Sequence, residues 1–187
     1  MIVPSRRLFL PSPGWGHTSL LISQGFHGVM ATYYGSYSLS DALISKVDDT
    51  IQQQHHNINP SGTKSIRWSG FISPSVAQIY TMQTALADLD QRVKLWLDNR
   101  LLVDQWTSLA ATDIHATIAF GTALGYFRIL MEYQHSVGPM GATLRWKSRA
   151  QGMTTVPVGS LFLRPQKLGP AASTKGSTRF SFAGRPR

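Results

Sequence analysis

The residues of this 187-residue sequence whose types and spacing could do chemistry include Asp88 and Asp90, in the polar segment ADLDQRVKLW. They lie two positions apart, so on a regular strand both side chains would point the same way. A glycosidase needs two carboxylates facing one bond, about 5–10 Å apart. Nothing else in the sequence supports that role, since Glu132 is the sole glutamate and lies in the middle of a predicted strand.

Signatures of other enzyme classes are missing from the sequence. There is no Gly-rich phosphate loop, no nucleophile elbow and no His-Glu-x-x-His zinc motif. The chain has no cysteine, which removes disulfides, thiolate zinc sites and cysteine nucleophiles together. We therefore predict that the protein is not an enzyme.

Four tryptophans lie on strand-like patterns and have two interpretations. An exposed indole can stack on a sugar ring, whereas a buried one anchors a sandwich core through about 200 Å² of buried surface. The strand patterns favour the core for most of them, and we keep Trp96 as a candidate ligand contact beside the Asp88–Asp90 segment. The four are Trp68, Trp96, Trp106 and Trp146.

The net charge of +9 belongs mainly to one end of the chain. From Arg145 onward there are nine Lys or Arg and no acid, whereas between Gly28 and Leu144 seven Lys or Arg accompany nine Asp or Glu. Residues 166–187 are rich in Gly, Pro, Ser and basic side chains, which bury too little apolar surface to offset the entropy of ordering. We predict a flexible basic tail there and an irregular lead-in over residues 1–27. No nucleic-acid partner is expected, and binding through the tail is the weaker alternative.

Between these ends, apolar residues recur with a period of two, which is typical of half-buried strands. In GYFRILMEYQ, one face carries Phe127, Ile129, Met131 and Tyr133, and ATLRWKS alternates in the same way. Short strands separated by Gly and Asn/Asp at about ten-residue spacing predict an all-β antiparallel sandwich or barrel over residues 28–165.

Two further elements are predicted from turn and capping residues. Asp98-Asn99 separates KLWL from RLLV, and Asn tolerates the positive φ that a two-residue hairpin turn needs, so residues 93–106 are predicted to form a β-hairpin. The segment LSDALISKVDDTI favours one short helix after Ser40, which would cap it.

Five segments, in order and at matching spacing, resemble the protective-antigen-like (PA fourteen) domain family. They are GVMATYYG (28–35), IRWSGFISP (66–74), IYTMQTALADLDQRVKLWLDNRLLVDQW (79–106), GYFRILMEYQ…GATLRW (125–146) and VPVGSLFLRP (156–165). The family includes anthrax protective antigen, modules of bacterial glycosidases, yeast flocculins and adhesins, and fibrocystin-like surface proteins. The resemblance implies a β-sandwich without catalytic machinery of its own, in which Asp104 bonds a neighbouring turn.

The resemblance also implies a metal site. In the family's adhesins, adjacent aspartates before the hairpin hold a calcium ion that coordinates sugar hydroxyls. Asp90 and Gln91 take the places of that pair here, and Arg92 replaces the usual glycine. Calcium prefers six to eight oxygens, which Asp88, Asp90, the Gln91 carbonyl and another loop would have to supply. Two interpretations stay open: a weak calcium site at Asp88 and Asp90, or solvated loop acids.

We predict from this resemblance a non-catalytic carbohydrate-recognition module with ligand contacts at Asp88, Asp90, Gln91 and Trp96. A glycan or glycoprotein partner and an extracellular or cell-surface location follow from the family. The alternative is a structural or protein-interaction module of a larger surface protein, which the loss of the second aspartate favours. Apolar runs are far shorter than the roughly 20 residues that cross a bilayer. The N-terminal stretch also lacks the run of a secretory signal, so we expect a fragment or an incomplete N-terminus.

Overall fold

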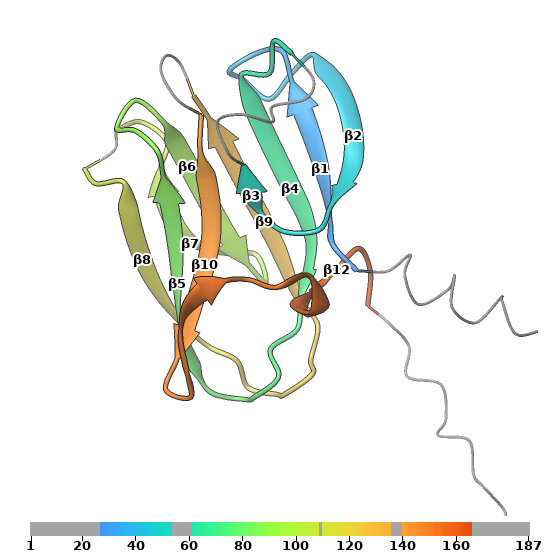
Figure 1. Ribbon diagram of the computed structural model, residues 1–187, viewed down its shortest axis with the longest axis vertical. Helices are drawn as coiled ribbons and strands as arrows, with labels where there is room; N and C mark the ends of the chain where they lie inside the picture. The colour runs from blue at the N-terminus through green and yellow to red at the C-terminus, as the bar shows by residue number, and fades with distance from the viewer. Residues whose placement is uncertain (1–26, 54–60, 109, 136–139, 166–187) are drawn as a thin grey trace, which may run out of the picture.

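The computed structural model describes residues 27–53, 61–108, 110–135 and 140–165, which form two antiparallel β-sheets packed as a sandwich (Figure 1). The predicted all-β fold is therefore confirmed. The predicted flexible tail, and all but residue 27 of the predicted lead-in, lie outside the described residues.

The larger of the two sheets, called the large sheet below, has seven strands. Its strands follow the order β2-β1-β4-β9-β6-β7, and β12 pairs with β4. Their bounds are β1 Val29–Tyr34, β2 Ala42–Asp48, β4 Ser65–Ile72, β6 Arg92–Leu97, β7 Arg100–Gln105, β9 Phe127–Gln134 and β12 Leu161–Phe162.

The small sheet has five strands in the order β11-β10-β5-β8, with β3 paired to β10. A short 3₁₀ turn, Val158–Ser160, leads into β12. The strand bounds are β3 Gln52–Gln53, β5 Ile79–Leu86, β8 Asp113–Ala119, β10 Ala142–Ser148 and β11 Gln151–Thr155.

The core lies between the sheets and is built by the period-two pattern. Ile129, Met131 and Tyr133 of β9 are all fully buried, and Leu144 and Trp146 of β10 belong to the same apolar cluster. Fully burying each large apolar side chain stabilises the fold by about 1.5–3 kcal/mol. The alternation that predicted these strands therefore also predicts which of their faces is buried.

The helix predicted within LSDALISKVDDTI is wrong. Ala42–Asp48 forms β2, an edge strand that pairs with β1 from Val29↔Asp48 to Tyr33↔Ile44. Ser40 does not cap a helix, because its backbone N–H and side chain both bond the Ser36 hydroxyl within a loop. Nearly all of β2 is exposed, so its side chains carry no burial pattern from which to recognise a strand, and pairing with β1 decides the conformation.

The predicted hairpin is confirmed. Asp98 and Asn99 join β6 to β7 with φ of 47° and 63°, as expected for a two-residue turn with positive φ at both positions. The Asp98 backbone N–H donates to the Arg128 carbonyl at 2.8 Å, and the Asp98 carboxylate accepts from the Arg128 backbone N–H at 2.8 Å. The turn is thereby tied to the end of β9.

Candidate functional site

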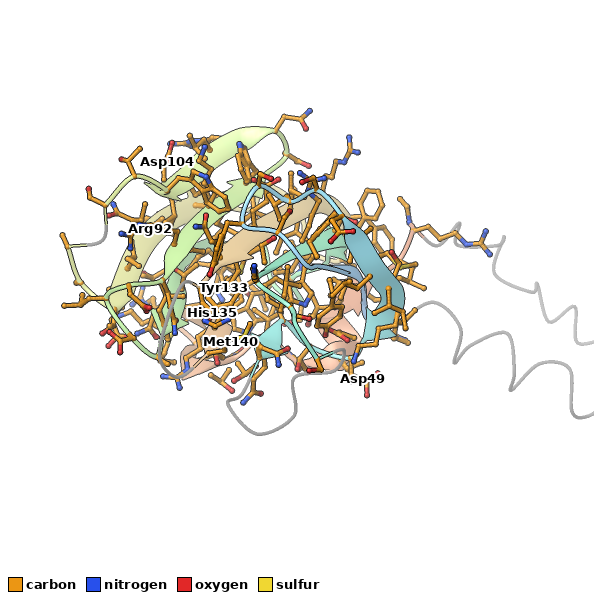
Figure 2. All side chains as sticks on the ribbon, turned by 90° about the horizontal axis from the view of Figure 1, so that it is seen from above. Asp49, Arg92, Asp104, Tyr133, His135 and Met140 are labelled. Atoms are coloured by element: carbon orange, nitrogen blue, oxygen red, sulfur yellow. The ribbon has the colours of Figure 1, made fainter. Side chains whose placement is uncertain are left out.

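One end of the sandwich gathers the loops that carry most of the predicted site, and we call it the loop end. Tyr34, Ser65, Gln134 and Arg92 lie in register across four strands at this end, and Leu86 pairs with Ala142 in the small sheet. Figure 2 views this end from above and places Tyr133, His135 and Met140 near its middle. The described residues of the loop end are 35–41, 61–64, 87–91, 106–108, 110–112, 135 and 140–141.

The predicted ligand residues Asp88, Asp90 and Gln91 lie in the turn between β5 and β6, not on a strand. Gln91 is fully buried, and its side-chain oxygen accepts a hydrogen bond from the Ala87 backbone N–H at 3.0 Å. One oxygen of Asp88 accepts from the Leu89 N–H at 2.6 Å. The turn thus uses oxygen atoms that a bound ligand or metal would otherwise meet.

Arg92, which stands where the family usually has glycine, also bonds the backbone of this turn. Its guanidinium donates to the Leu89 carbonyl at 3.0 Å and to the Gln91 carbonyl at 2.7 Å. Within the described residues, no three His, Asp or Glu side chains gather as a metal-binding group. The ligand contacts at Asp88, Asp90 and Gln91, and the calcium site at Asp88 and Asp90, stay predictions. Calcium would need backbone or water oxygens beside the two carboxylates.

His135 and Tyr133 supply ring side chains behind this turn. Burial lowers the pKa of His135, against the opposing effects of a hydrogen bond with the Thr63 backbone and the negative charge of Asp90. The Tyr133 hydroxyl accepts a hydrogen bond from the Gly141 backbone N–H at 3.1 Å. Burial raises the pKa of Tyr133 well above its ordinary value, so the phenol stays protonated. Its role is to hold the backbone at Gly141.

The tryptophans divide between core and surface. Trp68 and Trp146 are buried in the core, as predicted. Trp96 and Trp106 are half-buried, and the Lys94 ammonium lies 5.9 Å and 5.6 Å from their ring centroids. Trp96 lies next to the Asp98-Asn99 turn at the far end of β6, so the structure does not bring it together with Asp88 and Asp90 as predicted. The Asp104 carboxylate accepts from the Trp106 backbone N–H at 3.3 Å, which confirms the expected bond to a neighbouring turn.

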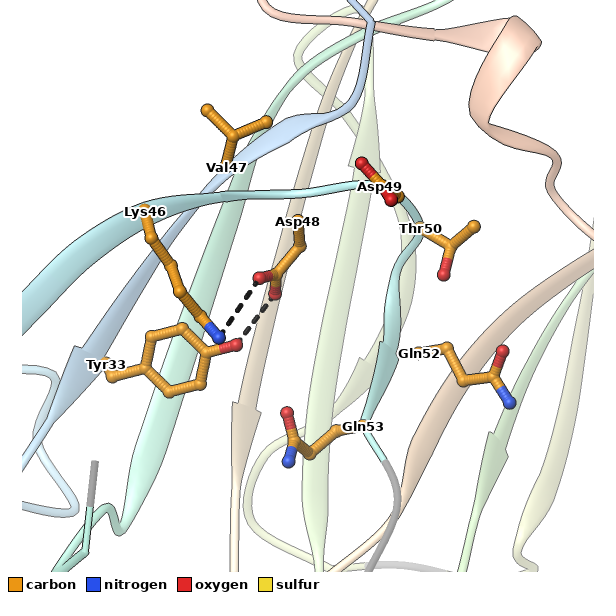
Figure 3. A pocket seen from close by; sticks show the side chains of 8 residues that line it. All are labelled: Tyr33, Lys46, Val47, Asp48, Asp49, Thr50, Gln52 and Gln53. Carbon is orange, nitrogen blue, oxygen red and sulfur yellow. Dashed lines mark hydrogen bonds and ion pairs between the residues drawn. The ribbon is translucent and has the colours of Figure 1, made fainter. Parts of the chain in front are cut away.

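A polar pocket on the flank of the sandwich was not predicted from the sequence. It lies beside β2 and β3, has a volume of about 460 Å³, and is drawn in Figure 3. At its wall, the Asp48 carboxylate accepts from the Tyr33 hydroxyl at 2.7 Å and from the Trp68 indole N–H at 3.0 Å, and the Lys46 ammonium is 3.7 Å away. Burial and the bond to Asp48 raise the pKa of Tyr33 above its ordinary value. The segment KVDD, which supplies Lys46, Asp48 and Asp49 to this pocket, is the sequence feature that could have indicated it. A helix in this segment would not place Asp48 beside Tyr33 of β1.

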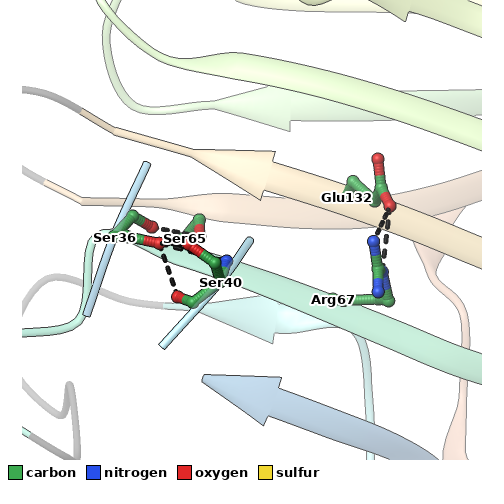
Figure 4. A network of polar contacts seen from close by, with 5 residues as sticks. All are labelled: Ser36, Ser40, Ser65, Arg67 and Glu132. Atoms are coloured by element: carbon green, nitrogen blue, oxygen red, sulfur yellow. Dashed lines mark hydrogen bonds and ion pairs between the residues drawn. The ribbon is translucent and has the colours of Figure 1, made fainter. Parts of the chain in front are cut away.

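The sole glutamate is neutralised by a cation. Arg67 donates to Glu132 through Nε at 2.9 Å and Nη2 at 2.6 Å, as Figure 4 shows. The same figure shows a hydroxyl cluster at the loop end, where Ser65 donates to the Ser36 carbonyl at 2.6 Å and the Ser36 and Ser40 hydroxyls lie 2.9 Å apart. Glu132 is therefore held in an ion pair with Arg67.

The chain belongs to the PA14 domain family, because the model of that family, described as the PA14 domain, matches residues 25–159. The resemblance seen in the sequence is thereby confirmed. None of the described residues form a helix with the length and apolar character needed to cross a lipid bilayer.

Two relatives carry anti-sigma factor names. The anti-sigma-I factor RsgI3 of Acetivibrio thermocellus is 30% identical over 140 residues, which cover 72% of this chain and 21% of that protein. An anti-sigma factor domain-containing protein from Clostridium clariflavum has a TM-score of 0.66 at 25% identity, over 79% of this chain and 50% of that one. This chain therefore spans about a fifth of the first relative and half of the second.

A third likeness concerns the fold alone. The Epithelial Adhesin 9 A domain from Candida glabrata, solved in complex with Galβ1-3GlcNAc, has a TM-score of 0.56 at 9% identity. The match covers 74% of this chain and 90% of the adhesin domain. The adhesin and this chain share the sandwich architecture.

Proposed function

We propose that this chain is a non-catalytic carbohydrate-recognition module that binds glycans at the loop end. Membership of the PA14 family over residues 25–159 carries the proposal. An adhesin of the same fold was solved with a disaccharide bound, and extracellular glycans are the ligand class that such a module would meet. An extracellular or cell-surface location belongs to this proposal.

The side chains of the loop end suit sugar hydroxyls. The Tyr37 ring is 40% exposed, and the Lys64 ammonium lies 5.1 Å from its centroid. Hydroxyls of Ser36, Ser38 and Ser40 lie beside it in one loop. Exposed aromatic faces with nearby hydrogen-bonding groups are the usual means of holding a polar ring. Asp88 and Asp90 add carboxylate acceptors, alone or with a calcium ion between them and the sugar.

A glycan array tests this proposal with the full-length chain, in calcium and in a chelator. We expect selective glycan binding that is lost in a variant carrying Asp88→Ala and Asp90→Ala. Asp49→Ala is the matched control, because it removes an exposed acid away from the loop end. Binding that persists in chelator would remove calcium from the proposal and leave glycan recognition standing. An absence of binding to every glycan would contradict the proposal.

A second candidate function is a protein-interaction module within a larger regulatory protein. It is favoured by the anti-sigma factor relatives, of which this chain matches only a part, and by the burial of Gln91 in place of the second aspartate. The glycan array separates the two candidates, since the interaction module predicts no glycan binding. Co-purification of the chain with the remaining domains of its full-length protein would then support the interaction module.

A further inference from the structure

The outer face of the large sheet carries a trough that the loop-end site does not use. Two hollows of about 360 Å³ and about 460 Å³ adjoin there and share Ser69 and Arg128 in their walls. The first also contains Trp96, Asn99 and Leu130, and the second contains Met30 and Phe71. Together they make one elongated depression, which we call the trough.

The strand register explains why these side chains meet. Trp96, Leu130, Ser69 and Met30 are consecutive partners across β6, β9, β4 and β1. Alternation turns all of them to the face opposite the core. Arg128 lies two residues before Leu130 on that face, next to the hairpin turn. The trough therefore lies toward the end of the sandwich opposite the loop end.

The backbone of two trough residues is held by the hairpin turn. Asn99 is held in the left-handed region by the hairpin turn, and the Arg128 backbone is bonded in both directions to Asp98. Trp96 is half-buried, and the Lys94 ammonium lies 5.9 Å from the centroid of its ring. A backbone that is already held loses little conformational entropy when a ligand binds.

Charge distinguishes Arg67 from Arg128 on this sheet face. Arg67 is neutralised by Glu132 at 2.6 Å. Arg128 is exposed and forms no ion pair with any of the described residues. A guanidinium matches a carboxylate through two parallel hydrogen bonds. The trough therefore combines an indole face, an amide, a hydroxyl and a cation that has no ionic partner in the described part of the chain.

We propose that the trough is a second glycan-binding surface that takes a chain of acidic sugars, with one ring packed on Trp96 and its neighbour's carboxylate paired with Arg128. Asn99 and Ser69 bond the ring hydroxyls. The elongated shape suits a polymer, and the cation of Arg128 complements a uronate. This inference rests on the proposed function and adds to it a separate surface and a ligand class.

The test measures binding of the full-length chain by calorimetry to polygalacturonate and to the same polymer with its carboxyl groups reduced. We expect Arg128→Gln to weaken polygalacturonate binding about tenfold, because a charge-assisted bidentate contact is lost, and to leave binding of the reduced polymer unchanged. Trp96→Leu should weaken binding to both polymers. Arg145→Gln is the matched control, since Arg145 is an exposed arginine on the small sheet, and it should change neither.

Three results would overturn the proposal. Arg128→Gln and Arg145→Gln could have equal effects, polyglutamate could bind as well as polygalacturonate, or the reduced polymer could bind as well as the acidic one.

Asp90→Asn separates this proposal from the loop-end site. If neutral glycans bind and Asp90→Asn abolishes that binding, while polygalacturonate does not bind, the trough proposal fails and the proposed function stands. If no glycan binds, both fail. Arg128→Lys keeps the charge without the bidentate geometry, so an intermediate loss from a folded variant supports the assignment.

Discussion

A single carboxylate, Asp48, serves two buried aromatic donors. Tyr33 and Trp68 are almost fully buried, and both donate to the same oxygen of Asp48. Removing that acceptor leaves a hydroxyl and an indole N–H without a protein partner. We expect Asp48→Ala to lower the free energy of unfolding by about 3 kcal/mol, since each of the two donors left unsatisfied costs about 1–3 kcal/mol. Urea denaturation followed by tryptophan fluorescence measures the change.

Asp48→Asn is the control for that prediction. The amide keeps an acceptor oxygen at the same place and removes the charge, so most of the stability should remain. If both variants lost equal stability, the charge beside Lys46, and not the two hydrogen bonds, would be the source of the effect.

Gln91 gives a second prediction at the scale of the residue. Its side-chain oxygen satisfies the Ala87 N–H from a fully buried position, so truncation removes a hydrogen bond and leaves a cavity. We expect Gln91→Ala to destabilise the chain by about 1–3 kcal/mol, measured by urea denaturation. An unchanged stability would mean that the side chain leaves the turn in solution, where its oxygen would be available to a ligand.

The hairpin between β6 and β7 is the element whose turn can be improved. Asn99 occupies the second turn position with φ of 63°, where glycine is the residue that the turn type prefers. We expect Asn99→Gly to raise the free energy of unfolding slightly, because the relief of strain at positive φ exceeds the entropy that glycine adds to the unfolded chain. Asn99→Val should lower it, because a β-branched residue at positive φ is strained. Thermal unfolding measures both effects. If the midpoint temperatures of the two variants shifted in the same direction, this turn geometry would be contradicted.

Elements could be predicted from the sequence where one face is buried and the other is not. The alternation in β9 and β10 separates Ile129 and Leu144, in the core, from their outward neighbours. β2 lacks that contrast, because Leu43, Ile44 and Val47 are all more than 40% exposed. The conformation of an edge strand of this kind is set by its pairing with the neighbouring strand, here β1. The local sequence pattern of β2 does not show which strand it pairs with.

The candidate site was less predictable for a related reason. A glutamine next to an aspartate is typical of a solvated loop, yet Gln91 turns inward to reach Ala87. Asp48, Tyr33 and Trp68 come from three strands, so their contact follows from strand pairing alone. The trough likewise depends on the register of four neighbouring strands.

The stability of the whole molecule should depend on pH through His135. Burial lowers its pKa below the ordinary value of 6.5, so the unfolded chain takes up a proton more readily than the folded one. This contribution to stability is fully present above about pH 6.5 and is lost as the pH falls toward the lowered value. We expect the free energy of unfolding to decrease over that acidic interval, and His135→Gln to flatten the decrease.

His115→Gln provides the comparison, because His115 is exposed on β8. Urea denaturation at several pH values between about 5 and 8 would measure all three proteins. Identical pH dependence in the wild type and His135→Gln would place the acid sensitivity elsewhere, among the carboxylates.

The two ends of the folded domain lie side by side. His27 bridges to Phe162, and the Gly28 N–H donates to the Leu161 carbonyl at 2.8 Å. Because the two ends are adjacent, this domain could be inserted into a loop of another domain without separating the two sides of that loop. It could equally lie in tandem between neighbouring domains. The same closeness sets its mechanical behaviour. Pulling the two ends apart would first load the His27–Phe162 bridge and the two-residue pairing of β12 with β4, and the eight-residue pairing of β4 with β9 would bear load only afterwards.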